Sequence, residues 1–219
     1  MAKVKNIIQL YIICLFCFST SNAIAQSDYE EDLRTFFGGA MLGGNLSQIS
    51  GDGIEGFHKL GLNFGAMTYI KLDDNLALSM EMLYNEKGSN WWKGVDPAIA
   101  NMKNKIYNKY RITLPYAEIP VVLNIFDKHQ SNFGLGASYG RLFNEKEILD
   151  SADLSKTFPF RKYDVNLIIN GTLMFNQHWG MNLRFNYSMV NIRKLYNFDL
   201  SHREQQYSRL WTIRAIYLF

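Results

Sequence analysis

The period of the hydrophobic pattern constrains this chain more than any other feature, because apolar and polar residues alternate along much of it. Between residues 179 and 189 the odd positions carry large apolar side chains, and the even positions carry glycine, asparagine, arginine or serine. Successive side chains of a β-strand point to opposite faces, so this pattern predicts a strand with one apolar and one polar face. The C-terminal segment repeats it, with five residues on the apolar face: Trp211, Ile213, Ala215, Tyr217 and Phe219.

Two folds suit such strands, a soluble sandwich with its polar face outside and a membrane barrel with its apolar face outside. The mean hydropathy of -0.16 does not separate them, because the two faces of a barrel strand cancel. Beyond the first 25 residues no apolar run reaches helical-span length, so any membrane crossing is made by strands. Glycines on the polar side favour the barrel, since small inward residues let a narrow barrel close. They are Gly39, Gly43, Gly61, Gly65, Gly134, Gly136 and Gly140.

The alternation defines eight strands, and an even number is what a closed bacterial barrel requires. Their connections alternate between short (73–74, 127–131 and 176–178) and long (48–57, 88–110, 144–161 and 193–206). We therefore predict an all-β fold, an eight-stranded antiparallel transmembrane up-and-down β-barrel with short periplasmic turns, long extracellular loops and both termini in the periplasm. The expected strands are 35–47, 58–72, 75–87, 111–126, 132–143, 162–175, 179–192 and 207–219.

Aromatic residues sort by depth in this barrel and predict two interfacial girdles. The girdle on the turn side comprises Phe133, Phe175, Trp179, Tyr217 and Phe219. The girdle on the loop side comprises Tyr84, Tyr139, Tyr187 and Trp211.

The first segment has the features of a cleaved signal peptide. Lys3 and Lys5 precede a short apolar stretch, and Ala23-Ile24-Ala25 forms a small-x-small cleavage site. Residues 1–25 are therefore expected to be removed, and residues 26–219 to form the barrel domain. Both cysteines, Cys14 and Cys17, lie in the leader, so the 194 residues that remain hold no disulfide or thiolate metal site.

Charge excludes one class of partner. With Lys3 and Lys5 removed, the mature chain has 21 basic residues against 20 acidic ones and no long basic block. We therefore expect no nucleic-acid partner.

The alternation also directs four charged residues inward, namely Glu81, Glu118, Arg184 and Arg214. Charges that face lipid cost several kilocalories per mole, so an inward ion network is the favoured arrangement. An eight-stranded barrel is filled by its own side chains, which favours a structural network over a conducting pore. A proton or ligand path is the alternative.

Two further segments have unusual patterns, the proline-containing strand 111–126 and the long loop 88–110. Pro115 and Pro120 each remove a ladder donor from a strand with neighbours on both sides, which predicts a bulge or local strand break. In the long loop, Ile99, Met102, Ile106 and Tyr110 recur at helical spacing and predict a short amphipathic helix over the barrel mouth. Basic and aromatic residues of this loop are candidate contacts to lipopolysaccharide or a partner, namely Trp91, Trp92, Lys103, Lys105 and Lys109.

Catalysis and cofactor binding find little support in the sequence. Ser201, His202 and Glu204 form the one cluster that mixes nucleophile and base groups, and neighbours in sequence seldom converge on one point. His58, His129 and His178 lie near strand ends or in a turn, without the spacing of metal ligands. We expect no catalytic residues, no metal and no cofactor.

Four stretches of the chain resemble the PorT-like outer-membrane β-barrel family. They are 43–47 with 50–52; 81–88; Leu114-Pro115-Tyr116-Ala117-Glu118-Ile119-Pro120; and Ile216-Tyr217-Leu218-Phe219. The resemblance implies an eight-stranded barrel inserted by the outer-membrane assembly machinery, which reads a terminal aromatic strand such as Trp211 to Phe219, including Tyr217. It also implies an integral protein of the outer membrane in contact with lipid and lipopolysaccharide.

The named member of that family takes part in type IX secretion and gliding. The resemblance thus makes a secretion or envelope-assembly component, with an envelope protein as partner, the leading expectation for function. A stand-alone surface-recognition or adhesion barrel is the alternative, and a small-solute channel is a third class.

Overall fold

A single antiparallel sheet closes on itself to form the protein. The computed structural model describes residues 36–50, 56–92, 109–128, 131–149, 152–153, 155, 159–193 and 206–219. The predicted signal peptide lies outside these residues. The strands are β1 (Phe36–Ser50), β2 (Lys59–Asp73), β3 (Leu76–Trp92), β4 (Lys109–Phe126), β5 (Asn132–Leu142), β6 (Lys146–Leu149), β7 (Ala152–Asp153), β8 (Tyr163–Met174), β9 (Trp179–Ser188) and β10 (Tyr207–Leu218).

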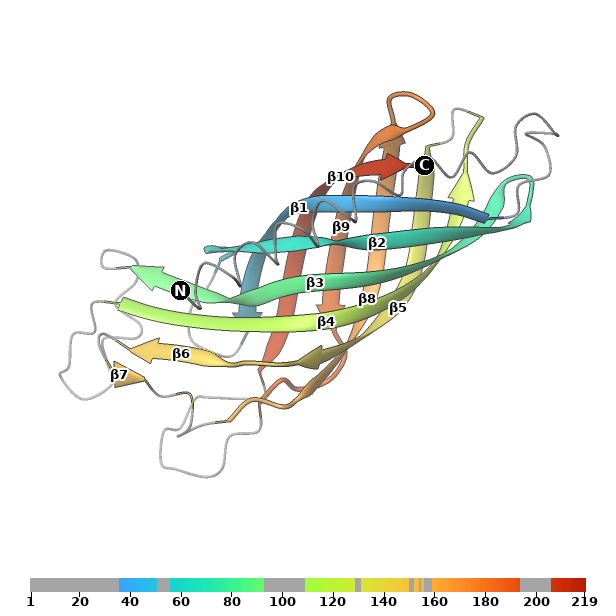
Figure 1. The fold of residues 1–219 in the computed structure, drawn as a ribbon. Coiled ribbons are helices and arrows are strands. Elements are labelled where there is room, and N and C mark those ends of the chain that lie inside the picture. Colours follow the sequence, from blue (N-terminus) through green and yellow to red (C-terminus); the bar gives the residue numbers. More distant parts are fainter. Residues whose placement is uncertain are drawn as a thin grey trace, which may run out of the picture. The chain divides into compact units, whose positions relative to one another are not determined.

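Eight of these strands form the barrel wall, in the order β1-β2-β3-β4-β5-β8-β9-β10, and β1 pairs with β10 to close it (Figure 1). The short strands β6 and β7 lie outside the ring and extend the edge of β4. The predicted fold class is confirmed, and each barrel strand begins within two residues of its expected position. Among the described residues no helix is long and apolar enough to cross a membrane.

The two faces of the wall are inverted relative to a soluble protein. Along Met181–Ser188 of β9 and Trp211–Ala215 of β10 outward and inward residues alternate, and the outward ones are apolar while the buried ones are polar or charged. Ile213 is 53% exposed, whereas its neighbours Thr212 and Arg214 are each 1% exposed. The seven glycines expected on the inner face all lie there. This inversion excludes the soluble sandwich, because an apolar exterior is stable only against lipid.

Aromatic side chains gather at both ends of the apolar exterior. On the turn side Tyr217 contacts Trp179, with 4.9 Å between ring centroids, and Phe219, with 5.7 Å. On the loop side Trp211 contacts Phe185 at 4.8 Å, and Tyr139 stacks on Tyr163 at 6.4 Å. These pairs form two belts at the levels expected for the membrane interfaces.

The prediction of the long loops was wrong in two places. β3 continues to Trp92 and β4 begins at Lys109, so both ends of the expected 88–110 loop belong to strands. Tyr110, expected on the apolar face of a helix, is instead a buried residue of β4. The expected 144–161 loop contains β6, which pairs with β4, and β7. Polar residues such as Ser89 suggested a loop, but Ser89 is buried and continues the strand alternation.

β4 runs without a break through both prolines, so the predicted bulge is absent. In the β3–β4 ladder two residue pairs are missing between Met80↔Val121 and Leu83↔Glu118, and the register is unchanged. Pro120 still pairs with Ser138 on the other side. Pro115 lies where β4 exchanges one neighbour, β5, for another, β6. The missing N–H groups are thus accommodated by a local gap in one ladder and by a change of neighbour.

Two adjacent glycines should respond in opposite ways to the same small substitution. A Cβ atom on the inward Gly43 would lie 2.0 Å from the Ile213 carbonyl oxygen, whereas on the outward Gly44 it would lie 3.7 Å from the Gly61 carbonyl oxygen. We therefore expect Gly43→Ala to reduce the folded fraction strongly and Gly44→Ala to leave it near that of wild type. The measurement is the heat-dependent mobility shift of unboiled against boiled samples on a gel. Equal folded fractions in the two variants would contradict the close approach of β1 and β10 at Gly43.

Candidate functional site

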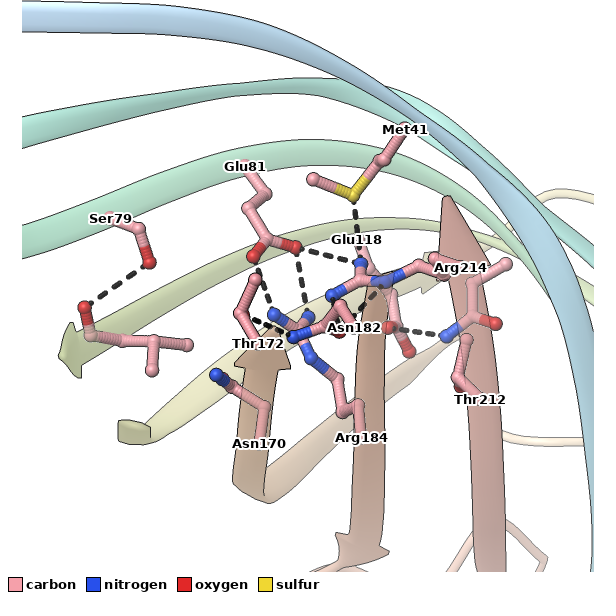
Figure 2. A network of polar contacts seen from close by, with 12 residues as sticks. Met41, Ser79, Glu81, Glu118, Asn170, Thr172, Asn182, Arg184, Thr212 and Arg214 are labelled. Carbon is pink, nitrogen blue, oxygen red and sulfur yellow. Dashed lines mark hydrogen bonds and ion pairs between the residues drawn. The ribbon is translucent and has the colours of Figure 1, made fainter. Parts of the chain in front are cut away.

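The charged residues of the barrel interior form separate clusters. In the first cluster Glu81 of β3 accepts hydrogen bonds from two arginines that come from the opposite wall (Figure 2). Arg184 of β9 binds it through both terminal nitrogens, at 2.8 Å and 2.5 Å, and Arg214 of β10 binds it at 3.1 Å. Bidentate pairing of this kind fixes the relative position of the two walls as well as neutralising charge.

The remaining donors of Arg214 also have partners within the barrel. Its Nε and Nη2 atoms donate to the Asn182 side-chain oxygen at 3.1 Å and 2.5 Å, and Nη1 lies 2.8 Å from the sulfur of Met41. The guanidinium is 1% exposed, so these contacts replace water that it has lost. Gly43 makes room for its side chain, because a Cβ atom there would lie 2.8 Å from the Arg214 Cγ atom.

A second cluster lies nearer the loop side and is built around Lys87. Its ammonium nitrogen is 2.5 Å from Glu118 and 2.8 Å from Asp164, and it donates to Asn166 at 3.1 Å. Ser188 donates to Asp164 at 2.5 Å. Lys87, Glu118 and Asp164 are each no more than 1% exposed. One cation against two carboxylates leaves this cluster with formal charge -1, which complements the charge of +1 on the Glu81 cluster.

Amide side chains connect the second cluster to the wall formed by β1 and β10. Asn85 donates to Glu118 at 2.7 Å, and Asn45 donates to Asn85 at 2.5 Å. Thr212 of β10 in turn donates to Asn45 at 2.9 Å. This chain of hydrogen bonds crosses from β4 through β3 and β1 to β10, so it ties both sides of the closing seam to the interior.

Apolar side chains fill the interior above and below the polar layer. At the turn side the cluster comprises Met41, Met67, Tyr69, Ala77, Leu83 and Ile216, packed against Phe37, Phe126 and Leu218. At the loop side it comprises Ile49, Tyr110, Ile112, Leu114, Tyr116, Leu142, Phe160 and Ile192. Phe160 and Ile192 come from the segments between barrel strands, so the connections fold inward and cover the mouth. Among the described residues, apolar side chains thus occupy the interior on both sides of the polar layer.

An ion pair at the loop-side mouth holds two of these connections together. Arg193 pairs with Glu147 of β6 and its guanidinium carbon lies 3.9 Å from the centroid of the Phe160 ring. The Tyr110 hydroxyl donates to Glu147 at 2.7 Å. Because β6 is attached to β4, this contact fixes the end of the last long loop over the apolar cluster.

The structure brings together some of the residues singled out from the sequence and separates others. Glu81, Arg184 and Arg214 meet in one cluster, but Glu118 belongs to the Lys87 cluster, so the single network expected from parity is two. Trp91, Trp92 and Lys109 lie at the ends of β3 and β4. Lys103 and Lys105 are outside the described residues, as are His129 and the Ser201, His202 and Glu204 cluster.

Sequence reasoning missed the centre of the second cluster, Lys87 and Asp164. Lys87 is the last residue of the strand predicted for 75–87 and has the inward parity of Glu81, but this parity was not used because Lys87 borders the expected loop. Asp164 has the same signal near the start of β8. The same rule directs three asparagines inward, namely Asn45, Asn85 and Asn166. Their amides were not considered as hydrogen-bond partners of the buried charged groups.

The arrangement as a whole serves stability more than chemistry. Within the described parts of the chain no group of three or more His, Cys, Asp or Glu residues could hold a metal ion. His58 and His178 are exposed, and the His178 ring contacts the Leu218 carbonyl at 3.1 Å. The buried charges are matched to fixed partners, which is what a packed interior needs to keep charges away from lipid.

An inverted eight-stranded wall, aromatic belts and a filled ionic interior together define a small outer-membrane β-barrel protein. Comparison with protein families bears this out, since the model for the outer membrane protein beta-barrel domain matches residues 24–194. The chain belongs to that family. The comparison with curated proteins finds no match.

Solved structures with a similar fold include three outer-membrane proteins. Neisserial surface protein A shares 10% identity at a TM-score of 0.49, covering 84% of this chain and 97% of that one. AlkL, solved in lipid bilayers, shares 14% sequence identity with this chain at a TM-score of 0.44. The match covers 90% of this chain and 95% of AlkL. Ail of Yersinia pestis, in complex with the heparin analogue sucrose octasulfate, shares 13% sequence identity with this chain at a TM-score of 0.43. The match covers 84% of this chain and 99% of Ail.

Removing the one carboxylate of the first cluster should destabilise the barrel. Glu81→Gln leaves Arg184 and Arg214 buried without a counter-ion, for which we expect a loss of about 3–5 kcal/mol in the free energy of unfolding. Urea titration of the protein in lipid vesicles, followed by tryptophan fluorescence, measures it. The control is Lys71→Gln, which breaks an exposed pair with Asp74 and should cost no more than about 1 kcal/mol. Similar losses in both variants would refute the structural role of the cluster.

Proposed function

We propose that this protein is a non-conducting surface-recognition barrel that binds a partner through an extracellular sheet. The observation that carries the proposal is the length of two paired strands. β3 has 17 residues and β4 has 18, whereas about 9–11 residues cross a membrane. Their ladder continues to Trp92↔Lys109, and β6 pairs with β4 near this end. Figure 1 shows β3, β4, β6 and β7 extending together at one end of the barrel.

The two faces of this extension differ in a way that supports a binding role. Its inner face carries Ile112 and Leu114, which cover the mouth. Its outer face carries the exposed Lys146 beside the half-buried Thr113 and Ile148. Arg111 is half-buried on the same face, and among the described residues neither cation is paired with a carboxylate. Unpaired cations on a rigid, solvated sheet favour a partner that carries anionic groups.

The filled interior argues against a solute channel. Apolar clusters lie above and below the ionic layer, and such constrictions exclude water. Planar bilayers that contain the folded protein should therefore show no stepwise conductance. Protein-free bilayers and a bilayer with an open porin are the two controls. Conductance steps whose frequency rises with the amount of folded protein would contradict the non-conducting part of the proposal.

Site-specific crosslinking in native outer membranes tests where the partner binds. A photoreactive residue at Lys146 on the outer face of the extension is expected to capture a macromolecule that copurifies with the barrel. The matched position is Asp74, an exposed residue of the tight turn at the opposite end. Capture at Asp74 alone would contradict surface recognition and would favour the secretion or envelope-assembly role that the family resemblance predicts, because that end faces the periplasm in the predicted orientation.

A further inference from the structure

The lipid-facing wall carries a groove that the proposed function does not use. It lies over β1, β2, β9 and β10 and has a volume of about 540 Å³. Gly44 leaves the gap, since this outward position has no side chain between its larger neighbours. The side chains that line the gap are Leu46, Leu60, Leu183, Trp211 and Ile213.

The composition and depth of the groove limit what can occupy it. Asn45 also borders the groove, but its side chain is buried inside the barrel, where it donates to Asn85. The other side chains that line the groove are apolar, and Trp211 belongs to the aromatic belt on the loop side. The groove therefore opens into the hydrocarbon region of the membrane half next to the extracellular surface. An acyl chain is the apolar ligand present at that depth.

A cation lies at the loop-side end of the same surface. Arg209 is the next outward residue of β10 after Trp211, about 7 Å further along the strand. It is exposed, and its guanidinium carbon lies 5.6 Å from the centroid of the Tyr187 ring. Among the described residues no carboxylate pairs with it. Stacking on tyrosine orients the guanidinium while its N–H donors stay available for an anion.

We propose that this wall binds a phosphorylated, acylated glycolipid of the outer leaflet, with an acyl chain in the Gly44 groove and a phosphate on Arg209. From the membrane interior towards the loop side, the wall presents the apolar groove first and the cation second. The acyl chain and the phosphate of such a lipid lie in the same order. A guanidinium matches phosphate geometry through paired N–H donors. This lipid site is separate from the proposed extracellular binding sheet, because it lies over β1, β2, β9 and β10 and at the depth of the membrane.

The test measures binding of bis-phosphorylated lipid A to the folded protein by native mass spectrometry in mild detergent. Gly44→Leu places a side chain in the groove, and its Cβ atom would make an ordinary van der Waals contact, 3.7 Å from the Gly61 carbonyl oxygen. Arg209→Ala removes the phosphate contact. Arg209→Ala is expected to weaken binding about tenfold, the value of one hydrogen bond to a charged group. Gly44→Leu is expected to weaken it about tenfold as well, because the acyl chain loses apolar contact with the groove. The heat-dependent gel shift establishes that each variant is folded.

Two matched controls separate this site from general attraction to lipid. Ala40→Leu adds a similar side chain at another outward position of β1. Arg161→Ala removes a guanidinium that lies 5.3 Å from the Tyr163 ring and does not belong to the residues that line the Gly44 groove. Both controls are expected to bind within twofold of wild type.

Several results would overturn the proposal. If the control variants lose as much affinity for lipid A, any outward cation or any added outward side chain would affect binding, and the site would not be specific. Equal affinity for dephosphorylated lipid A would exclude the phosphate contact, and equal affinity for the deacylated, phosphorylated disaccharide would exclude the groove. A lipid-independent dimer that Gly44→Leu abolishes would identify a second copy as the occupant.

Discussion

The rest of this structure depends on the need to satisfy backbone hydrogen bonds where no water is present. In hydrocarbon an open sheet edge leaves N–H and C=O groups unpaired, so the wall must close, here through twelve residue pairs between β1 and β10. Closure with eight strands leaves a lumen only wide enough for side chains. The inward glycines, the outward apolar residues and the buried charges all follow from that geometry.

Buried charge is tolerable in this barrel because of how the interior is layered. Apolar clusters lie on both sides of the Glu81 and Lys87 clusters, which have opposite formal charges, and asparagine side chains link the Lys87 cluster to β1. Low polarity around the layer strengthens each pair and makes each unpaired group costly. The interior therefore fixes one arrangement of strands, since a shift in register would place a charge against an apolar cluster.

Period-two patterning was enough to predict the barrel, because in a membrane both faces of every strand are under strong constraint. It predicted the inward direction of Glu81, Arg184 and Arg214 for the same reason. It failed at Ser89 and Tyr110, near the loop-side ends of β3 and β4, where the outward face no longer needs to be apolar. The pattern could not predict which inward residues pair, because it gives the direction of a side chain but not its depth in the barrel. Glu118 was therefore grouped with Glu81, although it pairs with Lys87.

The sequence separation within the Glu81 cluster has a consequence for how the protein reaches the membrane. Glu81 meets Arg184 and Arg214 across 103 and 133 residues, so these contacts exist only once late strands have arrived beside early ones. A partly inserted chain would hold these charges without partners, which is unfavourable in lipid. Charge neutralisation and ring closure are thus coupled events, and half-assembled barrels have little tendency to accumulate in the bilayer.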